Sequence, residues 1–310
     1  MALTMMVLLR SCFTLCLLLV CSGAVLPAEL ECRPLQIREV AYSGPQEFGQ
    51  GLLWRISKPG SPPSHIFGTI HVAERHVRAQ LGQVRQALTG SRVFVMEAVF
   101  DADGIELLRE MMFFNDATRL GDVIPADLYT RTLAILNAYH ITEQQLSMMK
   151  PWAAYLTMSY PADMGIILDQ RLLQLAEAAG IGAEGLESLA EQGQLFNNFS
   201  LTDQVRLLTD AVCHRALMES DFAQMIALYT TGDLAELSAY GQRYAFADNT
   251  LYETLTEKLL TRRNRLMVER MQTALATGDA FIAVGALHLP GAEGVLALLQ
   301  QNGFDITPVF

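Results

Sequence analysis

The chain has 310 residues, of which 51% are hydrophobic, and it carries a formal net charge of −11. This length fits one large domain or two small ones, and the hydrophobic content supports a packed core. Lys and Arg form no cluster that would neutralise phosphates, which argues against a nucleic acid as the partner.

Residues 1–24 predict an export signal. Arg10 is the only charge in them, an almost wholly apolar stretch follows it, and small residues at Ser22 and Ala24 fit a signal-peptidase site. The apolar stretch is shorter than the roughly 20 residues that a membrane span needs. We therefore expect residues 25–310 to be periplasmic or secreted. The alternative is a membrane anchor formed by an uncleaved N-terminus.

The cysteine content agrees with export. Cys12, Cys16 and Cys21 leave with the signal, so Cys32 and Cys213 remain. In an oxidising compartment this single pair predicts a disulfide that ties the start of the mature chain to its middle. The alternative is two unrelated thiols.

The first elements expected after the signal alternate between strand and helix. Residues 51–70 predict a hairpin around the turn 58–64, which is rich in proline and glycine. Apolar residues spaced three and four apart then predict a helix over 76–89. Residues 92–97 predict a buried strand that ends on an acidic residue.

The remainder of the chain is mostly helical before it returns to alternation. A helical insertion is expected over about 104–245, interrupted by a short glycine-rich strand at 182–187. A long helix (249–277), a strand from Phe281, a helix (291–302) and a strand (304–309) follow. We therefore predict an α/β fold for residues 25–310: a mixed central sheet flanked by helices, with this large insertion.

Two strands of this fold are expected to close on the same short motif. Gly68 and His71 frame one Gly-x-x-His, and Gly285 and His288 frame the other. Such an end delivers an imidazole to the rim of the sheet, where the glycine permits close approach of another group. The alternative is a structural histidine at each strand end.

Glu97 supplies an acidic partner, because it ends a third apolar run. In open α/β sheets ligands gather outside the carboxyl ends of strands. Two histidines and a glutamate are a common ligand set for a catalytic divalent ion. Zinc, manganese and cobalt would all suit this set. We predict His71, His288 and Glu97 as ligands. If Glu97 does not bind the metal, it serves as the general base. Its structural alternative is a salt-bridged strand end.

Arg263 falls on an otherwise apolar stripe of the helix 249–277. An inward arginine needs a carboxylate or an anionic ligand, so it is expected to pair with Glu97 or to stabilise an oxyanion. Asn264 beside it could supply a hydrogen bond. The alternative is a surface arginine whose stem lies along apolar residues.

Two further acids are candidate supporting residues. Asp169 lies beside an apolar line in a predicted helix over 165–179, and Glu187 ends the glycine-rich strand. Glu187 alternatively caps the helix that follows it. Motifs of serine hydrolases, nucleotide-binding loops and ordinary zinc proteases are absent from the sequence.

Taken in order, these motifs resemble the TraB/GumN family, which is similar to the Tiki-type metalloproteases. The resemblance covers roughly residue 51 to the end of the chain and rests on Trp54, Gly68, His71, Glu97, Asp169, Glu187, Gln192, Arg263, Asn264, Gly285 and His288. It implies the fold of the haem-binding ChaN proteins and the erythromycin esterases. It also implies a metalloprotease centre at both Gly-x-x-His motifs and Glu97, supported by Arg263.

Two functions follow from the sequence. The first is an exported metal-dependent hydrolase that cuts a peptide or protein substrate. The alternative is a non-catalytic protein that binds a peptide signal or haem on the same fold.

Overall fold

The computed structural model describes residues 30–38, 46–72, 75, 77, 81–163 and 165–310. The predicted export signal lies outside the described residues, as do positions 76 and 78–80 of the predicted helix 76–89. Within the described ranges, no helix is long and apolar enough to cross a membrane.

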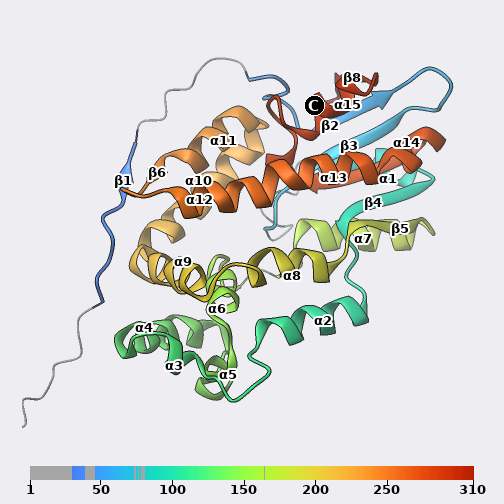
Figure 1. Ribbon diagram of the computed structural model, residues 1–310. Coiled ribbons are helices and arrows are strands. Elements are labelled where there is room, and N and C mark those ends of the chain that lie inside the picture. The colour runs from blue at the N-terminus through green and yellow to red at the C-terminus, as the bar shows by residue number, and fades with distance from the viewer. Residues whose placement is uncertain (1–29, 39–45, 73–74, 76, 78–80, 164) are drawn as a thin grey trace, which may run out of the picture.

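The fold is built on a six-stranded mixed sheet with the order β5-β4-β7-β3-β2-β8 (Figure 1). The middle strands β4, β7 and β3 pair in parallel, as does β5 with β4, whereas β2 runs antiparallel to both β3 and β8. The strands are β2 (Leu53–Ser57), β3 (Ser64–Thr69), β4 (Val93–Ala98), β5 (Gly182–Glu187), β7 (Ala280–Gly285) and β8 (Asp305–Pro308). The predicted mixed α/β sheet is confirmed.

Helices flank this sheet and fill most of the chain between β4 and β7. They are α1 (Leu81–Thr89), α2 (Ala102–Met112), α3 (Leu120–Val123), α4 (Ala126–Leu136), η3 (Asn137–Tyr139), α5 (Glu143–Met148), α6 (Pro151–Met158), α7 (Leu168–Ala178), α8 (Leu189–Asn197), α9 (Leu201–Cys213), α10 (Arg215–Thr231), α11 (Leu234–Gln242), α12 (Thr250–Thr256), η4 (Glu257–Thr261), α13 (Arg262–Arg270), α14 (Gln272–Thr277), η5 (Ala286–His288) and α15 (Val295–Gln301). A two-stranded ribbon joins β1 (Gln36–Ile37) to β6 (Tyr244–Ala245).

The direction of the crossovers decides which helices cover which face of the sheet. The connections from β3 to β4 and from β4 to β5 move the chain toward the β5 edge of the sheet. Those from β5 to β7 and from β7 to β8 move it toward the β8 edge. Right-handed crossovers then put α1 and α7 on one face and α13 to α15 on the other. Contacts between α1 and α7, and between α13 and α15, agree with this. Because both faces are covered, aromatic side chains such as Phe67, Phe94 and Phe281 are wholly buried in the middle strands.

The helices between β4 and α10 have a second apolar cluster, separate from the one around the sheet. Its members come mainly from α3 to α6 and α9, and Trp152 stacks on Phe196 within it. Figure 1 shows α2 to α6 grouped away from the sheet. The predicted insertion 104–245 thus contains this cluster together with β5, which is an edge strand of the main sheet.

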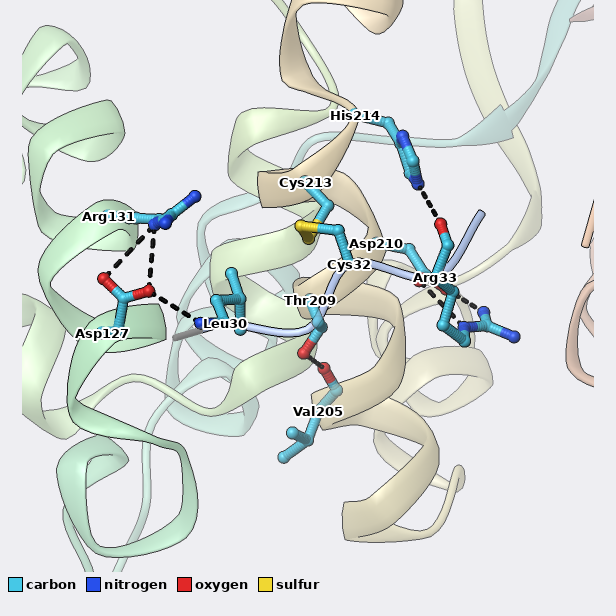
Figure 2. Close-up of a disulfide and its surroundings, with 10 residues drawn as sticks. All are labelled: Leu30, Cys32, Arg33, Asp127, Arg131, Val205, Thr209, Asp210, Cys213 and His214. Atoms are coloured by element: carbon cyan, nitrogen blue, oxygen red, sulfur yellow. Dashed lines mark hydrogen bonds and ion pairs between the residues drawn. A yellow bond between two sulfur atoms is a disulfide. The ribbon is translucent and has the colours of Figure 1, made fainter. Parts of the chain in front are cut away.

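A disulfide fixes the start of the described chain to the helices (Figure 2). Cys32 and Cys213 are joined with an S–S distance of 2.00 Å across 181 residues of sequence. Arg33 is ion-paired with Asp210 on α9, and the backbone N–H of Leu30 donates to the carboxylate of Asp127 on α4. A cross-link over so long a loop restricts the unfolded chain and so stabilises the fold.

Candidate active site

Four neighbouring parallel strands end at one edge of the sheet and bring the predicted residues together. Across that edge, Glu187 ends β5, Glu97 lies near the end of β4, His288 follows β7, and His71 follows β3. Each histidine lies just beyond its strand rather than in it, because β3 stops at Thr69 and His288 lies in the short turn η5. This edge is where ligands of open α/β sheets bind.

Arg263 lies between two carboxylates at this edge. Its Nη2 is 2.6 Å from Glu97 Oε2 and 2.7 Å from Glu187 Oε2, and its Nε donates to Glu187 at 3.0 Å. The remaining Nη1 donates to the carbonyl of Leu259 at 3.1 Å and to His288 Nε2 at 3.2 Å. The five N–H groups of a guanidinium are therefore all engaged inside the protein.

A turn of π-helix sets the position of Arg263. The sequence predicts one helix over 249–277, but the structure divides it into α12, the π-turn η4, α13 and α14. A π-turn inserts an extra residue and shifts the face that the following helix presents. The carbonyl of Leu259, in the π-turn, accepts from Arg263, whose guanidinium reaches Glu97 and Glu187 at the ends of β4 and β5.

Glu97 is held at both oxygens. Its Oε1 accepts from the backbone N–H of Gly285 at 2.6 Å and lies 3.6 Å from His288 Nε2. Burial alone would raise the pKa of Glu97, but His288 and the Arg263 guanidinium lower it to about 2. A Cβ on Gly285 would lie 3.1 Å from Glu97 Oε1, so glycine is what allows this carboxylate to approach the strand end.

His288 is buried, neutral and fixed in one tautomer. Its Nδ1 lies 2.6 Å from Asn264 Oδ1, and Asn264 Nδ2 donates to the carbonyl of Glu293 at 2.7 Å. The amide of Asn264 therefore accepts from His288 Nδ1–H, which leaves the lone pair on Nε2. Burial, helped by the charge of Arg263, lowers the pKa of His288 to about 4.

His71 is the solvent-facing histidine, with a side chain that is 41% exposed. Its Nδ1 lies 3.0 Å from Asp169 Oδ2, and the other oxygen of Asp169 accepts from the Thr69 hydroxyl at 2.8 Å. The Asp169 carboxylate raises the pKa of His71 to about 9, against the opposing effect of burial. The predicted supporting acids thus have separate partners: Asp169 orients His71, and Glu187 binds Arg263.

Gly68 lets the two motifs pack against each other. A Cβ at this position would lie 2.8 Å from Leu289 Cδ1, next to the turn that carries His288, and 3.0 Å from Ala286 Cα within that turn. The carbonyl of Gly68 accepts from the buried hydroxyl of Tyr229 at 2.7 Å. A side chain here would force β3 and the second motif apart.

Sequence reasoning missed several polar partners at this edge. Thr69 lies inside the first motif, yet its role depends on an aspartate 100 positions away. Tyr229 lies in α10, where no local pattern marks it. Burial raises the pKa of Tyr160 to about 12, and the charges of Tyr155, Glu97 and Asp169 add to this rise.

The donor atoms at this edge are of the kind that bind a divalent cation. Both histidines have Nδ1 held by a side-chain oxygen, the arrangement that presents Nε2 to a metal, and at His288 a metal would replace the hydrogen bond that Nε2 accepts from Arg263 Nη1. The 3.6 Å between His288 Nε2 and Glu97 Oε1 allows both atoms to bind one ion at about 2.0–2.2 Å each. Among the described residues, no three His, Cys, Asp or Glu side chains are already close enough to hold a metal.

Comparisons with known proteins agree with this geometry. The chain is 24% identical to metalloprotease TIKI2 of Danio rerio, in an alignment that covers 82% of this chain and 60% of the relative. It is also 24% identical to TIKI2 of Xenopus tropicalis, with 88% of this chain and 62% of the relative covered, and to TIKI1 of Danio rerio, with 84% and 64% covered. The matches thus span about three fifths of these relatives.

No solved structure matches this chain, so the fold shared with ChaN proteins and erythromycin esterases stays a prediction. The profile of one family, however, matches residues 52–308, which include the whole sheet and every residue at its carboxyl edge. The chain belongs to the TraB/PrgY/gumN family.

Proposed function

We propose that this chain is an exported metal-dependent hydrolase that cleaves a peptide bond, with His71, His288 and Glu97 as its metal ligands. The observation that carries the proposal is that both motifs fix their imidazole at Nδ1, at one sheet edge and beside a buried carboxylate. When bound, a divalent ion polarises a carbonyl group and lowers the pKa of a water molecule. The Tiki relatives support the reaction class.

The electrostatics favour Glu97 as ligand over Glu97 as general base. A base works best when its pKa is near the working pH, whereas the pKa of Glu97 is about 2. The assignment of Arg263 changes as well. Because its Nε and Nη2 donate to Glu97 and Glu187, Arg263 orients these two carboxylates rather than holding an oxyanion. His71, which faces solvent, is the ligand nearest to an incoming substrate.

Export is supported by the disulfide between Cys32 and Cys213, because such bonds persist in oxidising compartments. A peptide or protein is the proposed substrate, and zinc, manganese and cobalt all suit two imidazoles and a carboxylate.

The test is metal content measured together with peptide cleavage. The wild-type chain should bind one divalent ion and cleave members of a peptide library, and His71→Ala and His288→Ala should lose both properties. His140→Ala, which removes an exposed histidine on another element, is the matched control. Stoichiometric metal retained in both site variants would refute the ligand assignment.

A second candidate is a binding protein without turnover, favoured by the lack of a preassembled three-ligand group among the described residues. Haem or a peptide signal would be its ligand. Reconstitution with haem tests it: a Soret band that disappears in His71→Ala, with no cleavage of any peptide, would favour binding over catalysis.

A further inference from the structure

A pocket outside the candidate site opens between η3, the end of α6 and the first half of α10. Its volume of about 520 Å³ is within the usual range of small-ligand pockets. Apolar side chains supply much of its wall, among them Ile135, Ala138, Pro161, Met218 and Phe222. None of these residues has a role in the candidate active site.

The charge in the wall of this pocket is already balanced. Arg215 Nε is 2.9 Å from Glu219 Oε1, its Nη2 donates to the Tyr139 hydroxyl at 2.9 Å, and its Nη1 donates to the carbonyl of Met158. An anionic ligand would have to compete with Glu219 for this guanidinium. The pocket is therefore suited to an uncharged, apolar group.

The pocket is connected to the candidate site through α10. This helix lines the pocket at Met218 and Phe222, and further along Tyr229 bonds the carbonyl of Gly68. Seven to eleven residues at about 1.5 Å each place the pocket roughly 10–16 Å along the helix from that contact.

A second connection runs through the segment between α6 and α7. Tyr160 lines the pocket, and eight residues later the backbone N–H of Leu168 donates to the carbonyl of Val72, next to His71. Ile166 lies on this segment with its side chain 50% exposed. Ile166 is thus an exposed apolar residue on the stretch of chain that leads from the pocket toward Asp169.

We propose that this pocket, here called the α10 pocket, binds a large apolar or aromatic side chain of the polypeptide substrate. The roughly 10–16 Å along α10 to the Gly68 contact, at about 3.3 Å per residue of extended chain, sets the expected separation between this side chain and the cleaved bond at roughly three to five residues. The inference rests on the proposed function and adds a substrate class to it: polypeptides with an apolar anchor away from the cleaved bond.

Binding is measured first, without metal and without turnover. The probe is a glycine- and serine-rich heptapeptide with one central 4-fluorophenylalanine, followed by ¹⁹F NMR. Wild type should bind it saturably, and Ala138→Asp should bind it about tenfold more weakly because a charge then faces the apolar ring. Asn137→Asp adds the same charge to an exposed neighbour in η3 and should match wild type.

Equal binding by wild type and Ala138→Asp would overturn the inference, and so would no binding at all. Saturable binding of laurate in place of the peptide would also overturn it, by assigning the pocket to an acyl chain. A melting temperature within a few degrees of wild type confirms that both variants fold.

Kinetics then separate this inference from the proposed function. Among peptides that are cleaved, Phe placed three to five residues from the bond should raise kcat/KM about tenfold over Ser, and Ala138→Asp should abolish that gain. Cleavage that is indifferent to Phe refutes the subsite but leaves the hydrolase. Probe binding at the α10 pocket with no cleavage of any peptide refutes the hydrolase but leaves an apolar peptide site.

Discussion

Replacing Arg263 by Met tests the central electrostatic arrangement of the site. Methionine preserves much of the length and apolar volume of the side chain but removes the cation that is bonded to both carboxylates. The side chains of Glu97 and Glu187 are 9% and 4% exposed, so neither can be hydrated in compensation. Breaking a buried ion pair by removing one partner typically costs about 3–5 kcal/mol, and we expect a loss of unfolding free energy in that range.

The matched control is Arg265→Met, two residues further along α13. Arg265 also forms an ion pair, with Glu293 at 2.7 Å, but the two side chains are 64% and 57% exposed. Exposed pairs contribute about 0–1 kcal/mol, so this variant should be nearly as stable as wild type. Comparing the two variants separates the effect of burial from the loss of an arginine.

A second substitution identifies the cause of the loss. In the Arg263→Met background, Glu187→Gln removes one of the uncompensated charges and should recover about 1–3 kcal/mol, although the same change destabilises wild type. The assay is urea unfolding with the disulfide intact, comparing midpoints at equal m-values. If Arg263→Met costs no more stability than Arg265→Met, or if Glu187→Gln restores none of it, then Arg263 does not stabilise the fold by compensating the two buried carboxylates.

Four other predictions follow from the site. Because the pKa of His288 is about 4 when folded and about 6.5 when unfolded, stability should fall by about 3 kcal/mol between pH 6.5 and 4, and urea unfolding of His288→Asn should show less of this loss. Asp169→Asn, which removes the acceptor that orients His71, should weaken metal binding about 10–100-fold in calorimetric titrations. Gly68→Ala should cost about 1–3 kcal/mol in thermal unfolding, whereas Gly82→Ala, with open space around its added Cβ, should not destabilise. Finally, metal binding near pH 7.5 should release about one proton, because the pKa of His71 is about 9; titrations in buffers of different ionisation enthalpy would detect it, and release of none would contradict that state of His71.

The sequence predicts which strand ends carry polar residues better than it predicts their neighbours in space. Glu97 and the two histidines each follow an apolar run, so their place at strand ends can be read locally. The position of β7 between β3 and β4 cannot be read in this way, because it pairs residues that are far apart in the sequence, such as Val93 with Ala280 and His65 with Phe281. Pairing in the sheet, not sequence spacing, places His288 between Glu97 and His71.

The same distinction explains what was found and missed around Arg263. A charge in an apolar row is visible in the sequence and predicts an inward arginine. The π-turn before it leaves no such pattern, because residues 257–261 lie within a run that reads as one continuous helix in the sequence. Glu187 likewise reads as a helix cap by its position, and only the packed structure shows that it shares the guanidinium with Glu97.

The charge balance of the whole edge favours a divalent ion over a monovalent one. Arg263 with Glu97 and Glu187 contributes one positive and two negative charges, a net −1, and buried His288 is neutral. The His71–Asp169 pair is neutral while His71 keeps its proton and contributes a further −1 once His71 becomes a ligand. With the proposed ligands in place this edge thus carries −2, which a doubly charged cation would cancel. Because uncompensated charge at a mostly buried edge is costly, the proposed ligand set uses Glu187 in two ways: it holds Arg263, and its negative charge helps to match a divalent ion.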